Sequence, residues 1–383
     1  ETQGTSGTDF WGGNNGADNV YDGLGGDDYI VGSTGNDTLN GGDGDDWVYA
    51  WIGNNILDGG DGVDTLRYGA SKIPVDINVG DGTIRYISEG LDALPETYDY
   101  YLSIIDPTAI TQFTNFEIIH GSNNEYLGDV IDARTADRAY EIIADDGDDT
   151  VYGSAYSDTI SDGYGDDTIY GMGGDDTFIQ GSGGDTFDGG AGTDTVISNW
   201  SSSLPDYWTD DDFAVTNLQE GFGNILGRTS ELDDVYISIE NYYQTGTNGA
   251  AQMVIGSDAN NILSTSLGDD IIDGGAGNDR LYGNEGDDIL KTGSGDDKLY
   301  GGSGNDILEA TGSGHQYFDG GEGNDTFKVD INQYSLSDGF ISLTDLSSGF
   351  HGSKADPDHA LNDILVNIEN VELSGSYGAE IIG

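Results

Sequence analysis

The sequence predicts an all-β fold built from many short strands joined by tight turns. Three observations support this prediction. A nine-residue pattern recurs in three blocks, and each copy holds a glycine-rich turn, a carboxylate and a large apolar residue. The 64 glycines and 72 acidic residues follow this period instead of being scattered. Between the blocks, Val75–Val79, Phe213–Leu218 and Phe340–Leu346 alternate apolar and polar residues, as half-buried strands do.

The charge of the chain limits what it can bind. Only 11 basic residues oppose the acidic ones, which gives a net charge of -61. Repulsion of this size opposes a compact fold unless cations neutralise it. Nucleic acids and anionic membrane surfaces attract basic proteins, so both are excluded as partners. There is no cysteine, and no apolar run approaches the length of a membrane span, so we expect neither disulfides nor membrane insertion.

The clearest repeats run from Gly274 to Glu309 as four copies: GGAGNDRLY, GNEGDDILK, TGSGDDKLY and GGSGNDILE. Aligning the turn carboxylates predicts three repeat blocks, residues 1–67, 144–197 and 257–328, and three strand-rich segments, residues 68–143, 198–256 and 329–383, the last ending at the start of a further turn. Each segment contains a related phrase, called the closing phrase: residues 115–119, 238–242 and 367–371. The glutamates of these phrases are Glu117, Glu240 and Glu369, and they recur at long and nearly equal intervals. A repeat unit of this length favours a large or self-assembling protein.

The copies match the pattern GGxGxDxUx, where U is a large apolar residue. On these residues the chain resembles the RTX (repeats-in-toxin, haemolysin-type calcium-binding) family, including the repeat regions of large secreted bacterial surface, adhesin and surface-layer proteins. The resemblance implies several calcium-stabilised parallel β-rolls, separated by strand-rich capping segments in an elongated molecule. It also implies that calcium ions lie between turns eighteen residues apart, for example between Asp279 and Asp297. The predicted metal ligands are Asp18, Asp28, Asp37, Asp46, Asp64, Asp149, Asp158, Asp167, Asp176, Asp185, Asp194, Asp270, Asp279, Asp288, Asp297, Asp306 and Asp325.

The residue types of the turn suit calcium. Glycine backbones can take positive φ and direct several carbonyl groups to one point, and the aspartate adds a hard anionic oxygen. Calcium takes six to eight such oxygens, whereas magnesium tolerates irregular carbonyl cages poorly. No nitrogen or sulfur ligand recurs, which disfavours zinc and copper. An acidic linker without specific sites is the alternative, and the regular register opposes it. Weak or empty turns are expected at Asn55, at Asn261, at Gln316 and at residues 154–157.

The apolar residue of each strand is expected to face inward. Leu281, Leu299, Ile160, Ile169 and Phe178 would then stack as a thin ladder. Their neighbours would face outward: Arg280, Tyr282, Lys298 and Tyr300. A core this thin contributes little stability, so metal binding would supply folding free energy.

No catalytic pattern stands out, and we expect no enzyme activity. There is no HExxH zinc motif and no GxSxG nucleophile elbow. A glycosidase or epimerase site around Glu96 and Asp99 is a weaker alternative. Trp200, Tyr207 and Trp208, beside Asp210–Asp212, could hold a sugar ring, although core packing is favoured.

The function predicted from the sequence is that of a calcium-binding structural protein outside the cell or at its surface. It would be of surface-layer, adhesin or matrix type, would pass through type I secretion, and would fold, rigidify and self-assemble in calcium. Its predicted partners are calcium ions, copies of itself and cell-surface polysaccharide. Two alternatives remain, a non-catalytic RTX module of a secreted enzyme and a carbohydrate-binding adhesin module.

Overall fold

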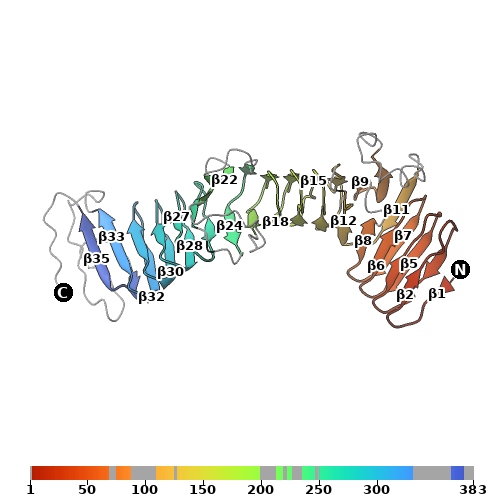
Figure 1. Cartoon of the computed structure of the whole chain (residues 1–383), viewed down its shortest axis with the longest axis horizontal. Helices are drawn as coiled ribbons and strands as arrows, with labels where there is room; N and C mark the ends of the chain where they lie inside the picture. The colour runs from red at the N-terminus through yellow and green to blue at the C-terminus, as the bar shows by residue number, and fades with distance from the viewer. Residues whose placement is uncertain are drawn as a thin grey trace. The chain divides into compact units, whose positions relative to one another are not determined.

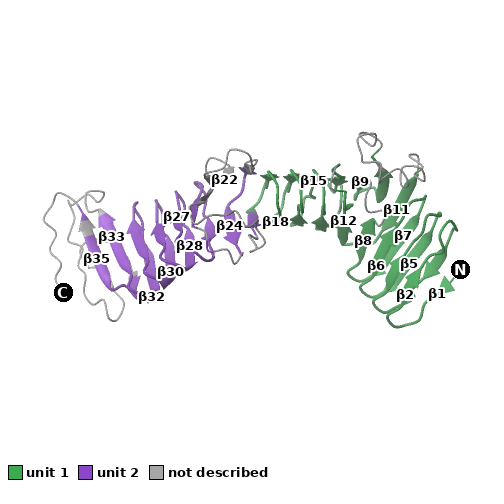
Figure 2. Cartoon of the chain, in the orientation of Figure 1, with its two compact units in different colours: residues 1–194 green, residues 195–383 purple. Residues whose placement is uncertain are grey.

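The computed structural model describes residues 2–68, 75–87, 109–124, 127–198, 213–218, 222–226, 235–245, 249, 251–330 and 364–374. These residues form strands, bridges, turns and bends only, which confirms the predicted all-β class. The chain divides into two compact units, residues 1–194 and 195–383 (Figure 2). The division into six segments stays a prediction. No helix able to cross a membrane occurs in the described part of the chain.

Unit 1 is a parallel β-solenoid whose strands alternate between two sheets (Figure 1). One sheet has the order β1 (Thr2–Gln3), β3 (Val20–Asp22), β5 (Thr38–Asp43), β7 (Ile56–Asp61), β11 (Ile110–Thr114), β10 (Thr83–Tyr86), β9 (Val75–Asn78), β13 (Val130–Asp132), β15 (Thr150–Tyr152), β17 (Thr168–Tyr170) and β19 (Thr186–Asp188). The other has the order β2 (Phe10–Gly12), β4 (Tyr29–Val31), β6 (Trp47–Ala50), β8 (Thr65–Tyr68), β12 (Ile118–His120), β14 (Glu141–Ile143), β16 (Thr159–Ser161) and β18 (Thr177–Gln180).

Unit 2 repeats this architecture (Figure 1). One sheet has the order β20 (Thr195–Ser198), β24 (Asn241–Gln244), β26 (Ile262–Ser264), β28 (Arg280–Glu285), β30 (Lys298–Gly304), β32 (Tyr317–Gly323) and β34 (Ile364–Val366). The other has the order β22 (Phe222–Leu226), β21 (Phe213–Asn217), β25 (Gln252–Ile255), β27 (Ile271–Asp273), β29 (Ile289–Lys291), β31 (Ile307–Ala310), β33 (Thr326–Asp330) and β35 (Asn370–Ser374). The unit also contains β23 (Val235–Ile237).

Within a regular block, neighbouring strands of one sheet are eighteen residues apart, so two nonapeptides form one coil. Val151 of β15 pairs with Ile169 of β17, and Ile169 pairs with Phe187 of β19. The middle residue of each strand is buried and its neighbours are more exposed, because successive side chains of a strand point to opposite faces. The parallel register therefore stacks equivalent apolar residues directly over one another.

The core of each solenoid is the predicted ladder of inward apolar residues. Leu281, Leu299, Ile160, Ile169 and Phe178 are fully buried, which confirms their predicted direction. The rings of Phe178 and Phe187, from the two sheets of unit 1, lie 5.6 Å apart between their centroids, so the sheets face each other across the ladder. Arg280 and Lys298 are exposed, and Tyr282 and Tyr300 stack on the outer face at 4.9 Å.

The first inter-block segment continues the sheets of unit 1 instead of separating two rolls. β11 pairs in parallel with β7, β9 pairs in parallel with β13, and β10 joins them by antiparallel pairing. In the other sheet β12 pairs with both β8 and β14. The open edges of both blocks are covered by this pairing. The strands predicted at Val75–Val79 and Phe213–Leu218 are confirmed as β9 and β21, and Phe340–Leu346 lies outside the described residues.

Candidate metal centre

Each regular turn has six residues, numbered from first to sixth, and a buried aspartate at the sixth position directly precedes the next strand. Its backbone N–H donates to Oδ1 of the equivalent aspartate one coil later, as from Asp149 to Asp167 (2.7 Å) and from Asp279 to Asp297 (2.9 Å). The same bond joins Asp28 to Asp46, Asp46 to Asp64, Asp158 to Asp176, Asp167 to Asp185, Asp176 to Asp194, Asp270 to Asp288, Asp288 to Asp306 and Asp306 to Asp325. The structure therefore brings the predicted ligands together in continuous rows.

The second oxygen of many of these carboxylates, Oδ2, is buried and accepts no hydrogen bond from any described residue. The side chains concerned are at most 2% exposed. An ionised carboxylate buried without a partner costs about several kcal/mol, so such groups are normally paired or bound to metals. The aspartates in this state include Asp28, Asp46, Asp64, Asp149, Asp167, Asp176, Asp279, Asp288, Asp306 and Asp325.

Main-chain carbonyl oxygens converge beside these Oδ2 atoms. A β-carbon added to Gly41, the first residue of its turn, would collide with Asp46 Oδ2 and with the carbonyl oxygen of Gly59 one coil later. Gly283 is bordered in the same way by Asp288 Oδ2 and the Gly301 carbonyl oxygen. A side chain at Gly41 or Gly283 would have to displace these oxygens. Carboxylate and carbonyl oxygens are the ligands of calcium, so the residues present fit this ion.

Amide side chains at the sixth position indicate which further carbonyls point toward the site. Asn55 Nδ2 donates to the Trp51 carbonyl (2.6 Å), and Gln316 Nε2 donates to the Gly295 carbonyl (2.9 Å). In each case the amide oxygen still accepts the N–H of the coil before, from Asp37 and Asp297 respectively. The neutral amide therefore adds no negative charge to its turn, and its nitrogen is paired with a main-chain carbonyl. This supports the expectation that the turns at Asn55 and Gln316 bind calcium weakly.

In two turns the backbone N–H of a serine at the second position donates to the sixth-position carboxylate, which therefore has a hydrogen-bond partner without a metal. Ser33 N–H donates to Asp37 Oδ2, and Ser154 N–H donates to Asp158 Oδ2, both at 2.6 Å. Ser154 Oγ also lies 3.0 Å from Asp158 Oδ1. Asp37 and Asp158, both predicted ligands, therefore differ from the other sixth-position aspartates. Ser257 N–H makes the equivalent bond to Asn261 Oδ1 (2.8 Å).

Two positions in unit 1 differ from the register that the sequence predicts. Asp18 is exposed and accepts the Asn36 N–H (2.8 Å), whereas Asn19 takes the buried sixth position and donates its N–H to Asp37 Oδ1 (2.9 Å). Asp129 holds the equivalent position of a longer turn, and its backbone N–H donates to Asp149 Oδ1 (2.6 Å). The sequence pattern did not reveal Asp129 because its turn, from Gly121, is longer than the repeat allows.

Burial raises the pKa of the sixth-position carboxyls, since charged groups are poorly solvated there. The pKa rises to about 6 for Asp46, about 7 for Asp64 and about 8 for Asp288. Backbone N–H donors lower these pKa values, and neighbouring carboxylates raise them further. For Asp149 the pKa rises to about 10, first from burial and then from the charge of Asp129. Asp288 and Asp149, whose pKa values lie above 7, need a compensating cation to hold a full negative charge at neutral pH.

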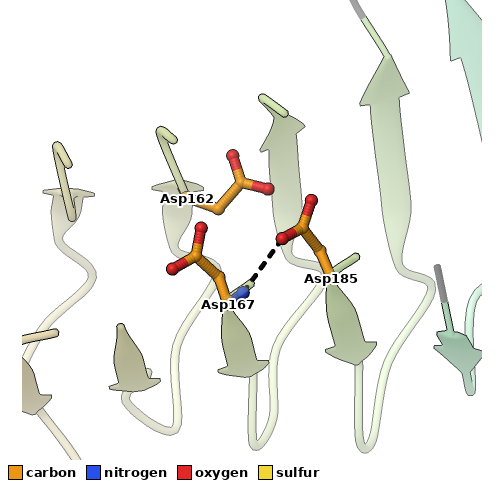
Figure 3. A group of neighbouring side chains, drawn as sticks. All are labelled: Asp162, Asp167 and Asp185. Carbon is orange, nitrogen blue, oxygen red and sulfur yellow. Dashed lines mark hydrogen bonds between the residues drawn. The ribbon is translucent and has the colours of Figure 1, made fainter. Parts of the chain in front are cut away.

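Three buried carboxylates meet at one point of unit 1, in the group Asp162, Asp167 and Asp185 (Figure 3). One oxygen from each lies within 4.8 Å of the others. Asp162 holds the first position of its turn, where glycine is usual, and its Oδ1 accepts the N–H groups of Gly163 and Gly181 (both 2.6 Å). Burial and the charges of Asp185 and Asp167 raise the pKa of Asp162 well above its usual range. The repeat pattern marks only the sixth position as a ligand, so it did not predict Asp162, although an aspartate in place of the first glycine was a visible signal.

We expect Asp162→Gly to weaken calcium binding at this group by about tenfold, because affinity follows the number of charged ligands. Glycine is the common residue at this position, so the variant is expected to fold in saturating calcium. Isothermal titration calorimetry with calcium measures the loss of affinity.

The matched control is Asp166→Asn, which removes an exposed charge four residues away and keeps the oxygen that accepts the Gly184 N–H. Equal loss of affinity in both variants would show that general charge, and not Asp162, sets the affinity.

Comparison with known families agrees with the geometry. A family model described as the RTX calcium-binding nonapeptide repeat (4 copies) matches residues 22–57, 31–66, 52–70, 143–178, 180–200, 255–290, 282–313 and 311–328. No curated protein matches the chain. The matched residues contain nearly all the predicted sixth-position aspartates and the buried rows that they form. The matched stretches of the three blocks are therefore RTX calcium-binding nonapeptide repeats, and the chain carries calcium-binding RTX repeats.

Proposed function

We propose that this protein is an extracellular structural protein, of surface-layer, adhesin or matrix type, that folds and becomes rigid when it binds calcium. The observation that carries the proposal is the row of buried Oδ2 atoms in each unit. Such a row places many carboxylates inside the solenoid, and bound cations offset the cost of burying their negative charges. RTX repeats are typical of secreted bacterial proteins.

The same rows suit a protein that crosses a membrane unfolded and folds outside. At low cytoplasmic calcium, the net charge of -61 and the unpaired carboxylates oppose folding. At the calcium concentrations found outside cells, which match the affinities of extracellular calcium modules, the ions bind only the folded state and stabilise it. Type I secretion followed by folding at the cell surface agrees with this behaviour.

A structural role is favoured over catalysis because the described carboxylates are arranged by repetition. Most described sixth-position aspartates repeat the contacts of the aspartate eighteen residues later, as Asp149 and Asp167 do, which is typical of a structural array. The sugar platform proposed at Trp200, Tyr207 and Trp208, and the site proposed at Glu96 and Asp99, lie outside the described residues.

Sedimentation velocity and electron microscopy of the purified chain test the assembly part of this function. In calcium we expect species larger than a monomer, growing with protein concentration into filaments or sheets, and in chelator a slowly sedimenting monomer. Magnesium serves as the control and should not promote assembly. A chain that folds in calcium but stays monomeric at every concentration would rule out self-assembly while leaving calcium-dependent folding intact.

A further inference from the structure

The closing phrases of the first and third segments continue the turn geometry beyond the last nonapeptide. Asn115 and Asn367 both have positive φ, 57° and 50°, a conformation that asparagine tolerates better than most residues. Their side-chain amides donate to equivalent carboxylates, Asn115 Nδ2 to Asp58 Oδ1 and Asn367 Nδ2 to Asp319 Oδ1, both at 2.8 Å. Two segments distant in sequence, one in each unit, thus hold an asparagine in the same way.

The glutamate of each phrase takes the place of the next sixth-position aspartate. In a regular coil Asp46 N–H donates to Asp64 Oδ1 (2.8 Å). At the end of the first block, Asp64 N–H donates to Glu117 Oε2 (3.1 Å). At the end of the third, Asp325 N–H donates to Glu369 Oε2 (2.8 Å). The row of N–H to carboxylate bonds therefore ends on a glutamate in both units.

The asparagine carbonyl takes the place of the next coil's glycine carbonyl. A β-carbon on Gly59 would collide with Asn115 O and approach Asp64 Oδ2, just as one on Gly41 would meet Gly59 O and Asp46 Oδ2. Gly320 is bordered in the same way by Asn367 O and Asp325 Oδ2. The last turn of each block therefore has the same pair of oxygens as the turns inside the block.

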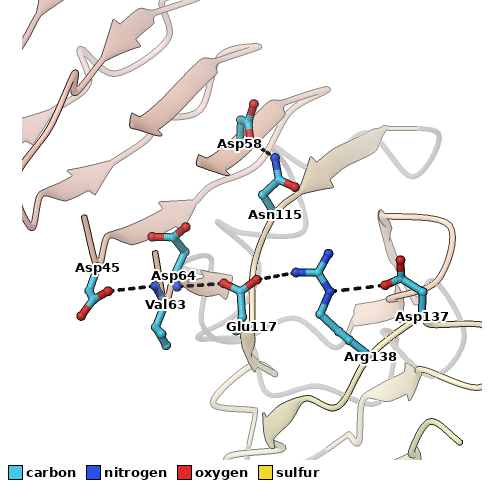
Figure 4. Close-up of polar contacts among 8 residues, drawn as sticks. All are labelled: Asp45, Asp58, Val63, Asp64, Asn115, Glu117, Asp137 and Arg138. Atoms are coloured by element: carbon cyan, nitrogen blue, oxygen red, sulfur yellow. Dashed lines mark hydrogen bonds and ion pairs between the residues drawn. The ribbon is translucent and has the colours of Figure 1, made fainter. Parts of the chain in front are cut away.

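The carboxylate oxygens directed to these points are buried and unpaired. Asp64 and Asp325 are 0% exposed, and neither Oδ2 accepts a hydrogen bond from the described residues. Glu117 differs because its second oxygen, Oε1, has a partner: it forms an ion pair with Arg138 Nη1 at 2.8 Å (Figure 4). Arg138 also contacts Asp137 (3.3 Å). The arginine compensates the charge of Glu117, whereas Asp64 is left with an uncompensated oxygen.

We propose, on the basis of the calcium-binding function proposed for the whole chain, that the closing phrases complete one additional calcium site at the end of each of these two blocks. Asp64 Oδ2 and Asn115 O are ligands of one site, and Asp325 Oδ2 and Asn367 O are ligands of the other. Glu117 and Glu369 are positioning residues that fix the aspartate backbone. The nonapeptide pattern alone does not assign either asparagine to a metal site.

Backbone variants of the full chain test the proposal, because the asparagine ligand is a carbonyl oxygen. Asn115→Val with Asn367→Val disfavours positive φ, since a β-branched residue is strained there. Asn115→Gly with Asn367→Gly keeps this conformation accessible. Equilibrium dialysis against calcium, with the bound metal counted by emission spectroscopy, should find two fewer ions per chain in the valine pair. The glycine pair should bind as many ions as the wild type.

The valine substitutions could disturb the ends of the blocks, so a second measurement uses the wild-type chain. In crystals grown with calcium, anomalous scattering should place an ion at about 2.3–2.6 Å from both Asp64 Oδ2 and Asn115 O, and likewise from Asp325 Oδ2 and Asn367 O. An unchanged ion count in the valine pair, or filled sites between nonapeptide turns with no ion at these two points, would overturn the inference. A chain that binds no calcium at any turn would overturn the proposed function as well.

Discussion

Chelation of calcium is expected to unfold the whole chain. Each site that binds calcium only in the folded state contributes about 2.7 kcal/mol when free calcium is 100 times Kd. Several such sites together match the roughly 5–15 kcal/mol that separates a typical folded domain from its unfolded state. The ladder of one inward residue per strand, such as Leu290 and Leu308, provides too little apolar burial to replace them. Circular dichroism in excess chelator should therefore show loss of the β-sheet signal.

Readdition of calcium should restore the signal, and an equal concentration of magnesium should not, because irregular cages of carbonyls and carboxylates suit calcium. A chelated chain that keeps its β-sheet signal and melts cooperatively would show that the carboxylate rows are tolerated without cations. Calcium would then not be required for folding, and the proposed folding switch would be wrong.

Acid is expected to stabilise the chelated fold, whereas most proteins lose stability in acid. The pKa of sixth-position carboxyls is higher in the folded state than the ordinary value of 3.8, reaching about 6 for Asp46, about 7 for Asp64 and about 8 for Asp288. The folded state therefore binds more protons than the unfolded state between those values, so the free energy of unfolding falls as pH rises. Stability should be fully present below about pH 4 and lost as pH passes through roughly 6 to 8.

Calcium should reverse this dependence, because it binds deprotonated carboxylates and releases protons on binding. Circular dichroism followed from pH 4 to 9, in chelator and in calcium, checks both signs. A chelated chain whose β-sheet signal grows as pH rises would contradict the burial of these carboxyls. Asp81→Asn, which changes an exposed turn residue of unit 1, is the control and should leave the slope unchanged.

The repeat period alone determined much of this fold. The spacing of nine placed one apolar residue inward per strand, so the buried positions of Leu281, Leu299 and Phe178 followed from the pattern. The same spacing aligned aspartates such as Asp149 and Asp167 on one side, because two nonapeptides form one coil. In a repetitive fold, each residue contacts the equivalent residue of the next coil. Such contacts can therefore be predicted from the spacing in a single sequence.

Only the tertiary structure decided the features that break the repetition. Three examples are the Ser154 N–H that donates to Asp158, the meeting of Asp162 with Asp167 and Asp185, and the buried position taken by Asn19 instead of Asp18. Each depends on contacts that the nine-residue period does not specify. The inter-block strands could be recognised by their alternation, but their partners could not, because β11 pairs with β7 across more than fifty residues. The closing phrases show the same limit. Asn115 and Asp64 share no period in the sequence, and only the tertiary structure brings the Asn115 carbonyl oxygen and Asp64 Oδ2 together beside Gly59.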